Sequence, residues 1–379
     1  MSTLKKIFIF SSLGLALLLF LGGIYILIFK PASKNSPASS SDSKSSPEKK
    51  LSSSEKMILL TDEPVFAPVL NEDGSALKYY SPKDQGFYEI SFDGKVRNLI
   101  LKKELPGLTD ILWSPAKNQA IFRIQPTPAT WNFVFFNFST QKETALGDNI
   151  DDIFWQNSNK ILYQYFDPAK KERTLNLSDP DGNNWKKIAD LNFTPVFSAG
   201  IPQSGLIAFW NNPDAYNEST LKSASLISGE NKTIFQGKFG ADFLWSPDGR
   251  LILASHSVER TGGKMQLAVM NDKGGEYKNL EIPTLTVKCA WSKDNRTVYY
   301  ALPASIPENA ILPNDYLSRQ FNTTDTFWKV NVLTGEKNRL IDLKKITVEA
   351  DATNLFLSPD ESLLFFTNRT DGKLYQISL

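Results

Sequence analysis

The sequence predicts an all-β repeat body that is carried by a single N-terminal apolar helix. Three observations predict this class: a charge-free apolar stretch at 7–29, a Ser/Pro/Lys-rich stretch at 30–56, and a strand–turn–strand pattern that recurs seven times in 57–379. Phe, Tyr and Trp make up 12% of the chain and recur at strand-like positions, which suits a large β-sheet core. Residues 1–6 are left as a short tail.

The apolar stretch 7–29 contains neither a charge nor a proline. At 1.5 Å per residue it is long enough to cross a bilayer core of roughly 30 Å, so we predict an uncleaved transmembrane helix that anchors the chain in the membrane. A cleaved signal peptide is the alternative, because Lys5 and Lys6 precede the apolar run. Typical signal peptides, however, have a shorter apolar region of roughly 7 to 15 residues.

The orientation follows from the short, basic tail 1–6, which favours the cytoplasm. The repeat body is then expected outside the cytoplasm, attached to the cytoplasmic membrane of a bacterial cell envelope. Lys30 and Lys34 on the other side of the helix leave the reverse orientation open. The segment 30–56 offers almost nothing to bury, so we predict a disordered tether with an end-to-end distance of roughly 30 Å.

Composition excludes several classes of function. The net charge is +1, with Lys and Arg scattered along the chain, so no nucleic-acid footprint is expected. Cys289 is the only cysteine and lies in an apolar run, which predicts a small core residue and no disulfide. His256 is the only histidine, which excludes histidine-cluster zinc sites. We predict no cofactor, no metal site and no catalytic constellation, and we interpret SDPDGNNW at 178–185 as a turn.

The repeat consists of a strand, a tight turn and a second strand. The Trp that ends the first strand, or its equivalent, recurs at intervals of about 42 to 46 residues and once at about 66, which is the period of a four-stranded propeller blade with one insertion. Five clear copies and two degenerate ones, the first and the fourth, run from the first repeat to the seventh at 68–80, 111–124, 153–166, 199–210, 243–255, 289–302 and 355–367.

Two further strands, joined by turns such as DG, TG and GG, follow each copy except the last, which stops after its third strand. The segment 57–61 (MILLT) can supply the missing fourth strand. The prediction is therefore a seven-bladed β-propeller of four-stranded antiparallel blades, whose ring is closed by the N-terminal strand.

The turns resemble the WD-like repeats of TolB-type β-propellers, most clearly at Trp245, Ser246, Pro247, Asp248 and Gly249. The resemblance covers 57–379 and implies a propeller fold and, as in TolB-type propellers, a protein partner. We interpret these residues structurally: Trp packs between blades, Pro and Asp start the turn, and Gly allows positive φ. Trp113, Trp155 and Trp291 are expected to play the same part as Trp245.

The longest connections between second and third strands are 211–222, 256–264 and 302–325. They are expected on one face of the ring, and long loops on a rigid scaffold commonly carry recognition. The insert 302–325 could instead be a cap that folds onto its own blade. The predicted binding residues on this face are Asp214, Tyr216, His256, Arg260, Asp315, Tyr316, Arg319 and Phe321. His256 taken alone is expected to be a hydrogen-bonded residue at a strand end and not a base.

The function expected from these observations is a non-catalytic module that binds a protein partner or serves as an envelope scaffold. The alternative is a propeller hydrolase or lyase that acts on extracellular polysaccharide or peptide. Paired carboxylates across the central channel would favour this alternative, because glycoside chemistry uses such pairs, whereas a channel filled by aromatic side chains would disfavour it. A third possibility is the same propeller on the cytoplasmic side.

Overall fold

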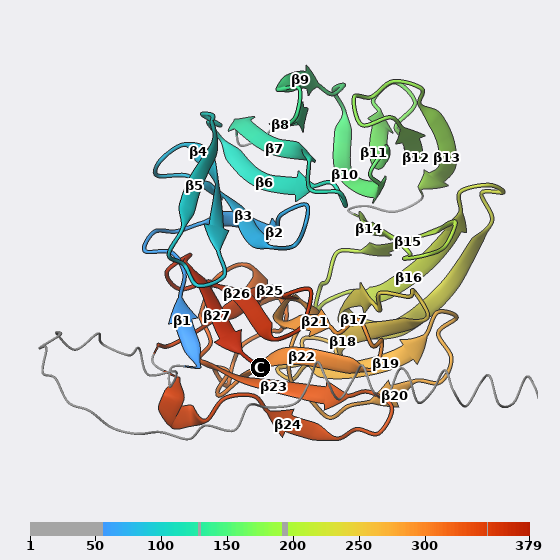
Figure 1. Ribbon diagram of the computed structural model, residues 1–379. Helices are drawn as coiled ribbons and strands as arrows, with labels where there is room; N and C mark the ends of the chain where they lie inside the picture. Colours follow the sequence, from blue (N-terminus) through green and yellow to red (C-terminus); the bar gives the residue numbers. More distant parts are fainter. Residues whose placement is uncertain (1–55, 128–129, 192–195, 347) are drawn as a thin grey trace, which may run out of the picture. The chain divides into compact units, whose positions relative to one another are not determined.

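A computed structural model describes residues 56–379, apart from 128–129, 192–195 and 347 (Figure 1). The predicted tail, the transmembrane helix at 7–29 and the tether up to residue 55 lie outside the described residues. Within the described residues, no helix is long and apolar enough to cross a membrane. The described residues form one compact unit, and its elements are almost entirely antiparallel β-strands.

Each repeat supplies an inner, a second, a third and an outer strand. The inner strands are β2 (Phe66–Leu70), β6 (Leu108–Trp113), β10 (Ile150–Asn157), β14 (Val196–Gly200), the end of β17 (Asn231–Trp245), β21 (Cys289–Trp291) and β25 (Ala352–Leu357). The second strands are β3 (Ala76–Ser81), β7 (Gln119–Thr127), β11 (Lys160–Asp167), β15 (Leu206–Asn211), β18 (Leu251–Ser257), β22 (Thr297–Pro303) and β26 (Leu363–Asn368).

The third strands are β4 (Gly86–Ser91), β8 (Thr130–Asn137), β12 (Glu172–Ser178), β16 (Glu218–Ser225), β19 (Gln266–Asn271), β23 (Asp325–Asn331) and β27 (Leu374–Ser378). The outer strands are β5 (Arg97–Lys102), β9 (Lys142–Ala145), β13 (Lys186–Leu191), the start of β17, β20 (Lys278–Asn279), β24 (Lys337–Arg339) and β1 (Met57–Leu59). Three short helices complete the described fold: η1 (Thr286–Lys288), α2 (Asn314–Leu317) and η2 (Leu343–Lys345).

Five sheets have four strands, but the fourth and fifth repeats share one seven-stranded sheet. This differs from the prediction of separate blades. The reason is that β17 runs on without a break: its first part, Asn231 to Phe239, pairs with β16, and its last part, Phe239 to Trp245, pairs with β18. Gly237 and Gly240 both have positive φ, so the strand turns from one partner to the other where glycine permits it.

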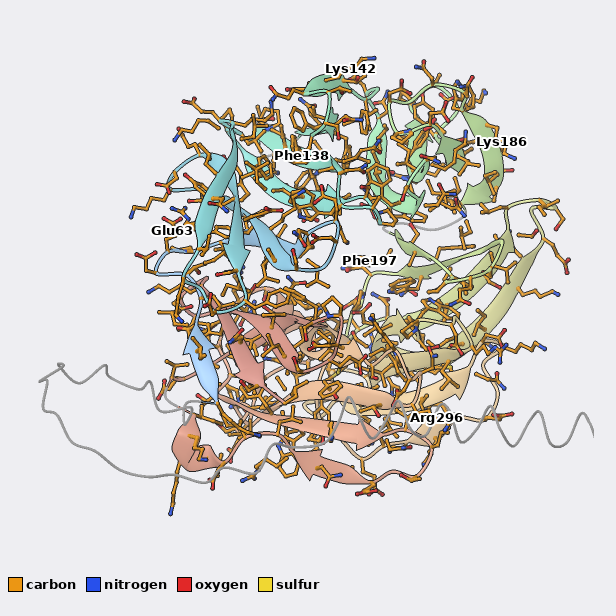
Figure 2. All side chains as sticks on the ribbon, viewed as in Figure 1. Glu63, Phe138, Lys142, Lys186, Phe197 and Arg296 are labelled. Atoms are coloured by element: carbon orange, nitrogen blue, oxygen red, sulfur yellow. The ribbon has the colours of Figure 1, made fainter. Side chains whose placement is uncertain are left out.

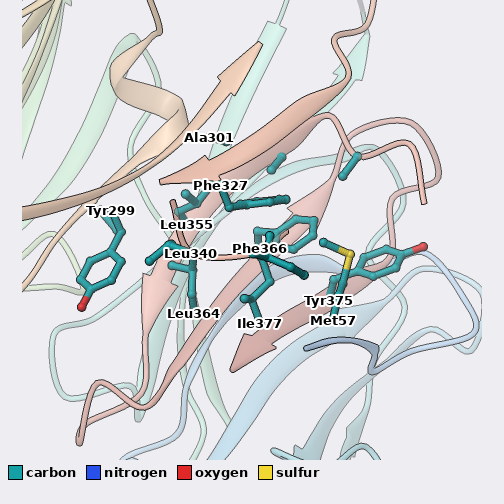
Figure 3. Packing of buried hydrophobic residues seen from close by; sticks show 14 residues of the cluster. Met57, Tyr299, Ala301, Phe327, Leu340, Leu355, Leu364, Phe366, Tyr375 and Ile377 are labelled. Carbon is teal, nitrogen blue, oxygen red and sulfur yellow. The ribbon is translucent and has the colours of Figure 1, made fainter. Parts of the chain in front are cut away.

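The first strand of the body pairs with the last. Met57 lies opposite Ile377 in the antiparallel pair of β1 and β27, and the amide of Ser378 donates to the carbonyl of Lys56 at 2.9 Å. Met57 also enters the hydrophobic cluster between the sixth and seventh repeats, together with Phe366 and Tyr375 (Figure 3). Burying such side chains stabilises the fold by about 1.5–3 kcal/mol each.

Apolar clusters join successive repeats, because each sheet buries both of its faces against its neighbours. The cluster around Phe122 and Trp113 joins the first and second repeats, and the cluster around Leu77, Phe365 and Leu374 joins the seventh repeat to the first. Cys289 is buried in one of these clusters, so the prediction of a small core residue is confirmed.

The repeat tryptophans tie each inner strand to the one before it. The indole nitrogens of Trp113 and Trp155 donate to Ala67 and Leu112 carbonyls of the preceding inner strands, both at 2.8 Å. Trp291 does the same to Leu244 at 3.1 Å. The Trp245 indole nitrogen is also buried, but it has no partner in the described part of the chain.

The turn after Trp245 is held as predicted. Asp248 accepts from the Ser246 hydroxyl at 2.6 Å and from the Arg250 amide at 3.1 Å. Gly249 has φ +72°, and a Cβ there would lie 2.2 Å from the Pro202 carbonyl oxygen of the previous repeat. The Pro247 carbonyl accepts a hydrogen bond from the Gln203 side chain at 3.3 Å. These residues therefore hold the turn and its contact with the previous repeat.

Candidate functional site

One position is equivalent in all seven repeats: it lies three residues before the residue that ends the repeat's first strand in the sequence pattern. Its occupants are Ala67, Asp110, Asp152, Phe197, Asp242, Lys288 and Asn354. In β2, β6, β10, β17 and β25 the pairing register shifts at this point. A β-bulge changes the direction of nearby side chains and is common beside active sites. The side chain at this equivalent position of the inner strand is therefore a candidate for a functional role.

A central pocket of about 620 Å³ lies beside these positions. Asp110, Asn354 and Ala67 line it from the inner strands, and Trp113 and Trp155 contribute to its wall. Arg319 from the insert and Arg369, which follows β26, also line it. The pocket therefore combines carboxylate, amide and guanidinium groups. Ligand sites typically contain a few polar groups of this kind.

Asp110 and Asp152 are the ionisable pair of this region. Both are half-buried and sit on the inner strands of neighbouring repeats. Burial raises the pKa of Asp110, and Arg123, directly opposite it on β7, opposes this rise. Burial also raises the pKa of Asp152 to about 6, where Arg123 again opposes the rise while the charges of Asp110 and Asp151 add to it. Two carboxyls near one cation are suited to acid–base chemistry.

Arg123 is held in place by aromatic rings. Its guanidinium carbon lies 4.3 Å from the centre of the Trp131 ring and 5.7 Å from that of Phe133. Such stacking orients a guanidinium group without using up its hydrogen-bond donors. The Arg123 Nε atom is buried and has no hydrogen-bond partner in the described part of the chain.

The other side of the central pocket is cationic. Arg369 donates through Nη2 to the Tyr316 carbonyl at 2.6 Å and stacks on the Tyr316 ring at 4.2 Å. Its Nη1 atom, and the Thr367 hydroxyl that lines the same pocket, are buried without a partner among the described residues. Unsatisfied buried donors are costly, so this wall is prepared to bind an anionic or hydroxyl-bearing group.

The remaining polar groups at the equivalent position are satisfied internally. Asp242 accepts from Thr286 at 2.6 Å and from Trp210 at 3.1 Å. Lys288 is fully buried and bridges Asp325 and Asp351, both at 2.6 Å. Phe197, labelled in Figure 2, stacks on Trp210 with ring centres 6.2 Å apart. Asp242 is half-buried like Asp110 and Asp152, but its carboxylate is held by the two side-chain hydrogen bonds from Thr286 and Trp210.

The insert 302–325 covers neighbouring repeats. Asn314 donates to Asp214 at 2.9 Å and accepts from the Ala215 amide at 2.8 Å, while Leu312 donates to the Gly262 carbonyl. The Tyr316 side chain is only 2% exposed, and its hydroxyl donates to Asp351 at 2.7 Å. The predicted alternative was a cap that folds onto its own blade. These contacts show a segment that covers other repeats instead.

The residues predicted to form one binding face have diverse surroundings. Tyr316 is buried against Phe321, and His256 is fully buried, with Nε2 2.6 Å from the Tyr277 hydroxyl and a pKa lowered by burial. Burial takes both residues off the predicted binding face, which corrects that prediction. For His256 it agrees with the alternative of a hydrogen-bonded residue at a strand end, here near the end of β18. Asp315 accepts from the Ile311 amide, and Asp214 from the Tyr216 amide. Tyr216, Arg260 and Arg319 are exposed, and of these Arg319 lines the central pocket.

Sequence reasoning missed Asp110 and Asp152. A signal was present, since Asp precedes the repeat Trp by three residues in the second, third and fifth repeats. The pattern D-x-x-W is part of the repeat, so it predicted a structural element and not a functional site. The difference between Asp242, which is bound, and Asp152, which is not bound in that way, depends on neighbours from other repeats.

Comparisons with known proteins identify the fold. The chain matches no protein-family model and no curated protein sequence. An oligogalacturonate lyase in complex with manganese is similar in structure, with 14% identity, a TM-score of 0.58 and coverage of 85% of this chain and 93% of that one. The oligogalacturonate lyase from Vibrio parahaemolyticus has 10% identity, a TM-score of 0.60 and the same coverage.

The β-propeller domain of Cps50 (Swd1) from Myceliophteria thermophila is also similar, with 10% identity, a TM-score of 0.52 and coverage of 85% and 99%. TolB from Acinetobacter baumannii has 12% identity, a TM-score of 0.45 and coverage of 73% and 62%. The chain thus resembles WD-like β-propellers, and the predicted propeller resemblance is confirmed at the level of architecture.

The expected non-catalytic scaffold is corrected by these findings. Two of the similar propellers are oligogalacturonate lyases, which are enzymes. Asp110 and Asp152 lie on the inner strands of neighbouring repeats, so they are a pair of carboxyls but not the pair across the central channel that was expected to favour the enzymatic alternative. The manganese of one lyase does not transfer to this chain, because no three His, Cys, Asp or Glu side chains gather to hold a metal ion within the described residues.

Proposed function

We propose that this protein is a propeller lyase that cleaves acidic polysaccharide by β-elimination at the Asp110 and Asp152 carboxyls, of which Asp110 lines the central pocket. The observation that carries the proposal is the pair of carboxyls, Asp110 and Asp152, with raised pKa values beside Arg123. A base is most effective when its pKa is near the working pH, and the pKa of Asp152 is about 6. The two lyases of similar fold support the same reaction class.

In the proposed reaction, Asp152 takes the proton from the carbon next to the sugar carboxylate. The electrons of that C–H bond form a C=C bond, and the adjacent bond between carbon and the glycosidic oxygen breaks. Asp110, whose pKa is raised by burial, would donate a proton to the departing oxygen. The reaction needs neither water nor an oxidant, and the proton taken by Asp152 returns to solvent.

The guanidinium groups would hold the substrate. Arg369 has an unpaired buried donor at the central pocket, and Arg319 lines the same pocket. Guanidinium binds carboxylate in a two-pronged geometry. This binding would neutralise the sugar carboxylate and make the adjacent proton more acidic, which is the main demand of an elimination reaction.

A glycoside hydrolase is the second candidate, and the pairing of two carboxyls on adjacent inner strands favours it. Asp110 would then act as the acid and Asp152 as base or nucleophile. The two reactions differ in product: elimination leaves an unsaturated sugar that absorbs ultraviolet light, whereas hydrolysis yields only new reducing ends. A panel of uronate-containing and neutral polysaccharides therefore separates them with the same protein.

The decisive experiment compares wild type with Asp152→Asn and Asp110→Asn on this panel. Each substitution is expected to lower kcat by about 10²-fold or more, because general acid–base catalysis contributes about 10²–10⁴. Asp93→Asn is the matched control, since Asp93 lies in the exposed β4–β5 turn, and it should leave kcat unchanged. No turnover of any polysaccharide by wild type, or full activity of both variants, would overturn the proposal.

We also propose the finer architecture and location. Counting the two halves of β17 separately gives seven four-stranded blades, and the pairing of β1 with β27 would close their ring. The apolar segment 7–29 would anchor this propeller in the cytoplasmic membrane, with the propeller on the outer side. Protease added to intact cells should then remove the propeller, and protection of the propeller would contradict this orientation.

A further inference from the structure

A second pocket, which we call the third-repeat groove, lies on the face of the β10–β13 sheet. Its volume is about 580 Å³. Tyr163 and Tyr165 on β11 line it, together with Asn176 on β12 and Trp185 just before β13, whose first residue Lys186 is labelled in Figure 2. None of the groups in the proposed catalytic pair lines this groove.

Asn176 is the feature that marks the groove as a ligand site. The residue is only 2% exposed, and its Oδ1 atom has no hydrogen-bond partner within the described residues. Its Nδ2 atom donates to the Thr174 hydroxyl at 3.0 Å. Turning the amide over would leave its nitrogen unpaired instead, so one end of the amide is unsatisfied in either orientation.

Local backbone structure aims this amide. The pairing of β12 with β13 shifts register between Leu175 and Asn176, and a β-bulge of this kind re-aims the adjacent side chain. Asn176 lies opposite Tyr163 on one side and Lys187 on the other. The unpaired amide therefore sits between an aromatic residue and a long polar one, all three lining the groove.

The aromatic residues give the groove a surface for flat, partly apolar ligands. Trp185 is 65% exposed at the edge of the groove, whereas Tyr163 and Tyr165 are half-buried in its wall. A large exposed aromatic side chain is costly in water and is typical of binding surfaces. Rings of this kind stack on the C–H faces of sugars, and the tyrosine hydroxyls remain to bond sugar hydroxyls.

The charges in the groove disfavour an anionic ligand. The ammonium group of Lys170 pairs with Asp167 at 3.5 Å, and that of Lys187 pairs with Asp190. Asp148 and Glu172 add further negative charge to the lining. This contrasts with the arginine-bearing central pocket, so the two sites are expected to prefer different parts of a ligand or different ligands.

We propose that the third-repeat groove is a non-catalytic binding site for a neutral oligosaccharide, which stacks on Trp185 and donates a hydroxyl to Asn176. A peptide would more naturally pair with a sheet edge, but the groove lies on the face of the sheet. The site would hold a neutral stretch of glycan while other chemistry takes place elsewhere on the protein. The inference does not require the proposed lyase activity.

The test is a titration of the full chain with neutral hexasaccharides from the cello-, xylo- and malto- series, followed by tryptophan fluorescence and calorimetry. Trp185→Ala and Asn176→Leu should each weaken binding by about tenfold or more, the typical loss at a dominant contact. Tyr216→Ala removes an equally conspicuous exposed aromatic residue, 44% exposed and outside the groove, and should leave binding unchanged.

Asp152→Asn separates this site from the proposed lyase. It should bind the neutral hexasaccharide as tightly as wild type, whereas Trp185→Ala should retain cleavage of a short acidic substrate. Two outcomes would overturn the inference: no binding of any of the three hexasaccharides by wild type, or binding that survives both groove substitutions. Binding of an unstructured peptide that Trp185→Ala abolishes, without saccharide binding, would also overturn it.

Discussion

At the scale of single residues, Asp152 illustrates how a half-buried carboxyl can weaken the fold that carries it. Its pKa is raised from 3.8 to about 6 in the folded protein. Between these values the native state holds a proton that the unfolded chain has lost, so stability falls as pH rises from about 4 to about 6. Above that window the charged carboxylate imposes its full desolvation cost.

Asp152→Asn should therefore be more stable than wild type at pH 8, and the advantage should shrink as pH falls towards 4. Urea denaturation at several pH values measures this difference. Asp93→Asn serves as the control: the pKa of Asp93 is lowered, chiefly by the Ser91 hydroxyl, so the pH trend should have the opposite sign. A pH-independent difference for Asp152→Asn would contradict the assigned burial.

Whereas the buried charge of Asp152 weakens the fold, the buried charge of Lys288 stabilises it. Lys288 is fully buried between Asp325 and Asp351 and also donates to the Thr323 hydroxyl at 2.9 Å. Burial would raise the pKa of Asp351, but Lys288 and the Tyr316 hydroxyl hold it below the ordinary value. This network fastens the insert to the seventh repeat, because Tyr316 belongs to the insert and Asp351 directly precedes β25.

Lys288→Met should destabilise the protein by about 3–5 kcal/mol, because removing one partner of a buried ion pair leaves uncompensated charge. Lys83→Met is the matched control, since the Lys83 side chain is 74% exposed, and it should change stability by less than about 0.5 kcal/mol. Chemical denaturation measures both. Equal, small effects would mean that the carboxyls are neutral in the native protein.

At the scale of elements, the inner strands are linked by the repeat tryptophans, and the links are unequal. The Trp155 indole nitrogen donates to the Leu112 carbonyl of the preceding strand at 2.8 Å. Trp245 occupies the same place in its repeat but has no hydrogen-bond partner in the described part of the chain. Both rings pack in clusters between neighbouring repeats, Trp245 more deeply than Trp155, so the hydrogen bond is the contribution that only Trp155 makes.

Trp155→Phe should cost about 1–3 kcal/mol more than Trp245→Phe, because only the former leaves a buried carbonyl without its partner. Thermal or urea unfolding of the two variants tests this difference directly, with each serving as the other's control for lost ring area. If Trp245→Phe proves the more harmful, ring packing and not the indole hydrogen bond sets the strength of these links.

At the scale of the whole molecule, the pairing of β1 with β27 joins the two ends of the described body. Removing residues 1–61 should lower stability substantially, since Met57 and Leu60 leave two clusters and each buried side chain is worth about 2–5 kcal/mol. Removing only 1–55 is the control. The longer truncation should also self-associate, because β27 becomes an open edge, which light scattering can detect. An unchanged, monomeric truncation would contradict the proposed ring closure.

Most of the fold could be predicted from the sequence, whereas the site could not. Local patterns with a fixed period predicted where the inner strand of each repeat ends and the turn at Asp248 and Gly249. They also predicted that Met57 pairs with the last strand. The continuous β17 was not predicted, because Gly237 and Gly240 looked like ordinary turn residues.

Local side-chain chemistry and periodicity thus determine the all-β repeat architecture, because a strand, a turn and a buried face are properties of short segments. Tertiary structure alone decided which of three similarly placed aspartates is bound and which remain available. Asp242 is bound because Thr286 and Trp210 of other segments reach it, while Asp152 interacts through charge with Asp110 and Arg123 of the neighbouring repeat. Burial and charge at one point depend on residues far away in the chain, and their positions are set only when the repeats pack together.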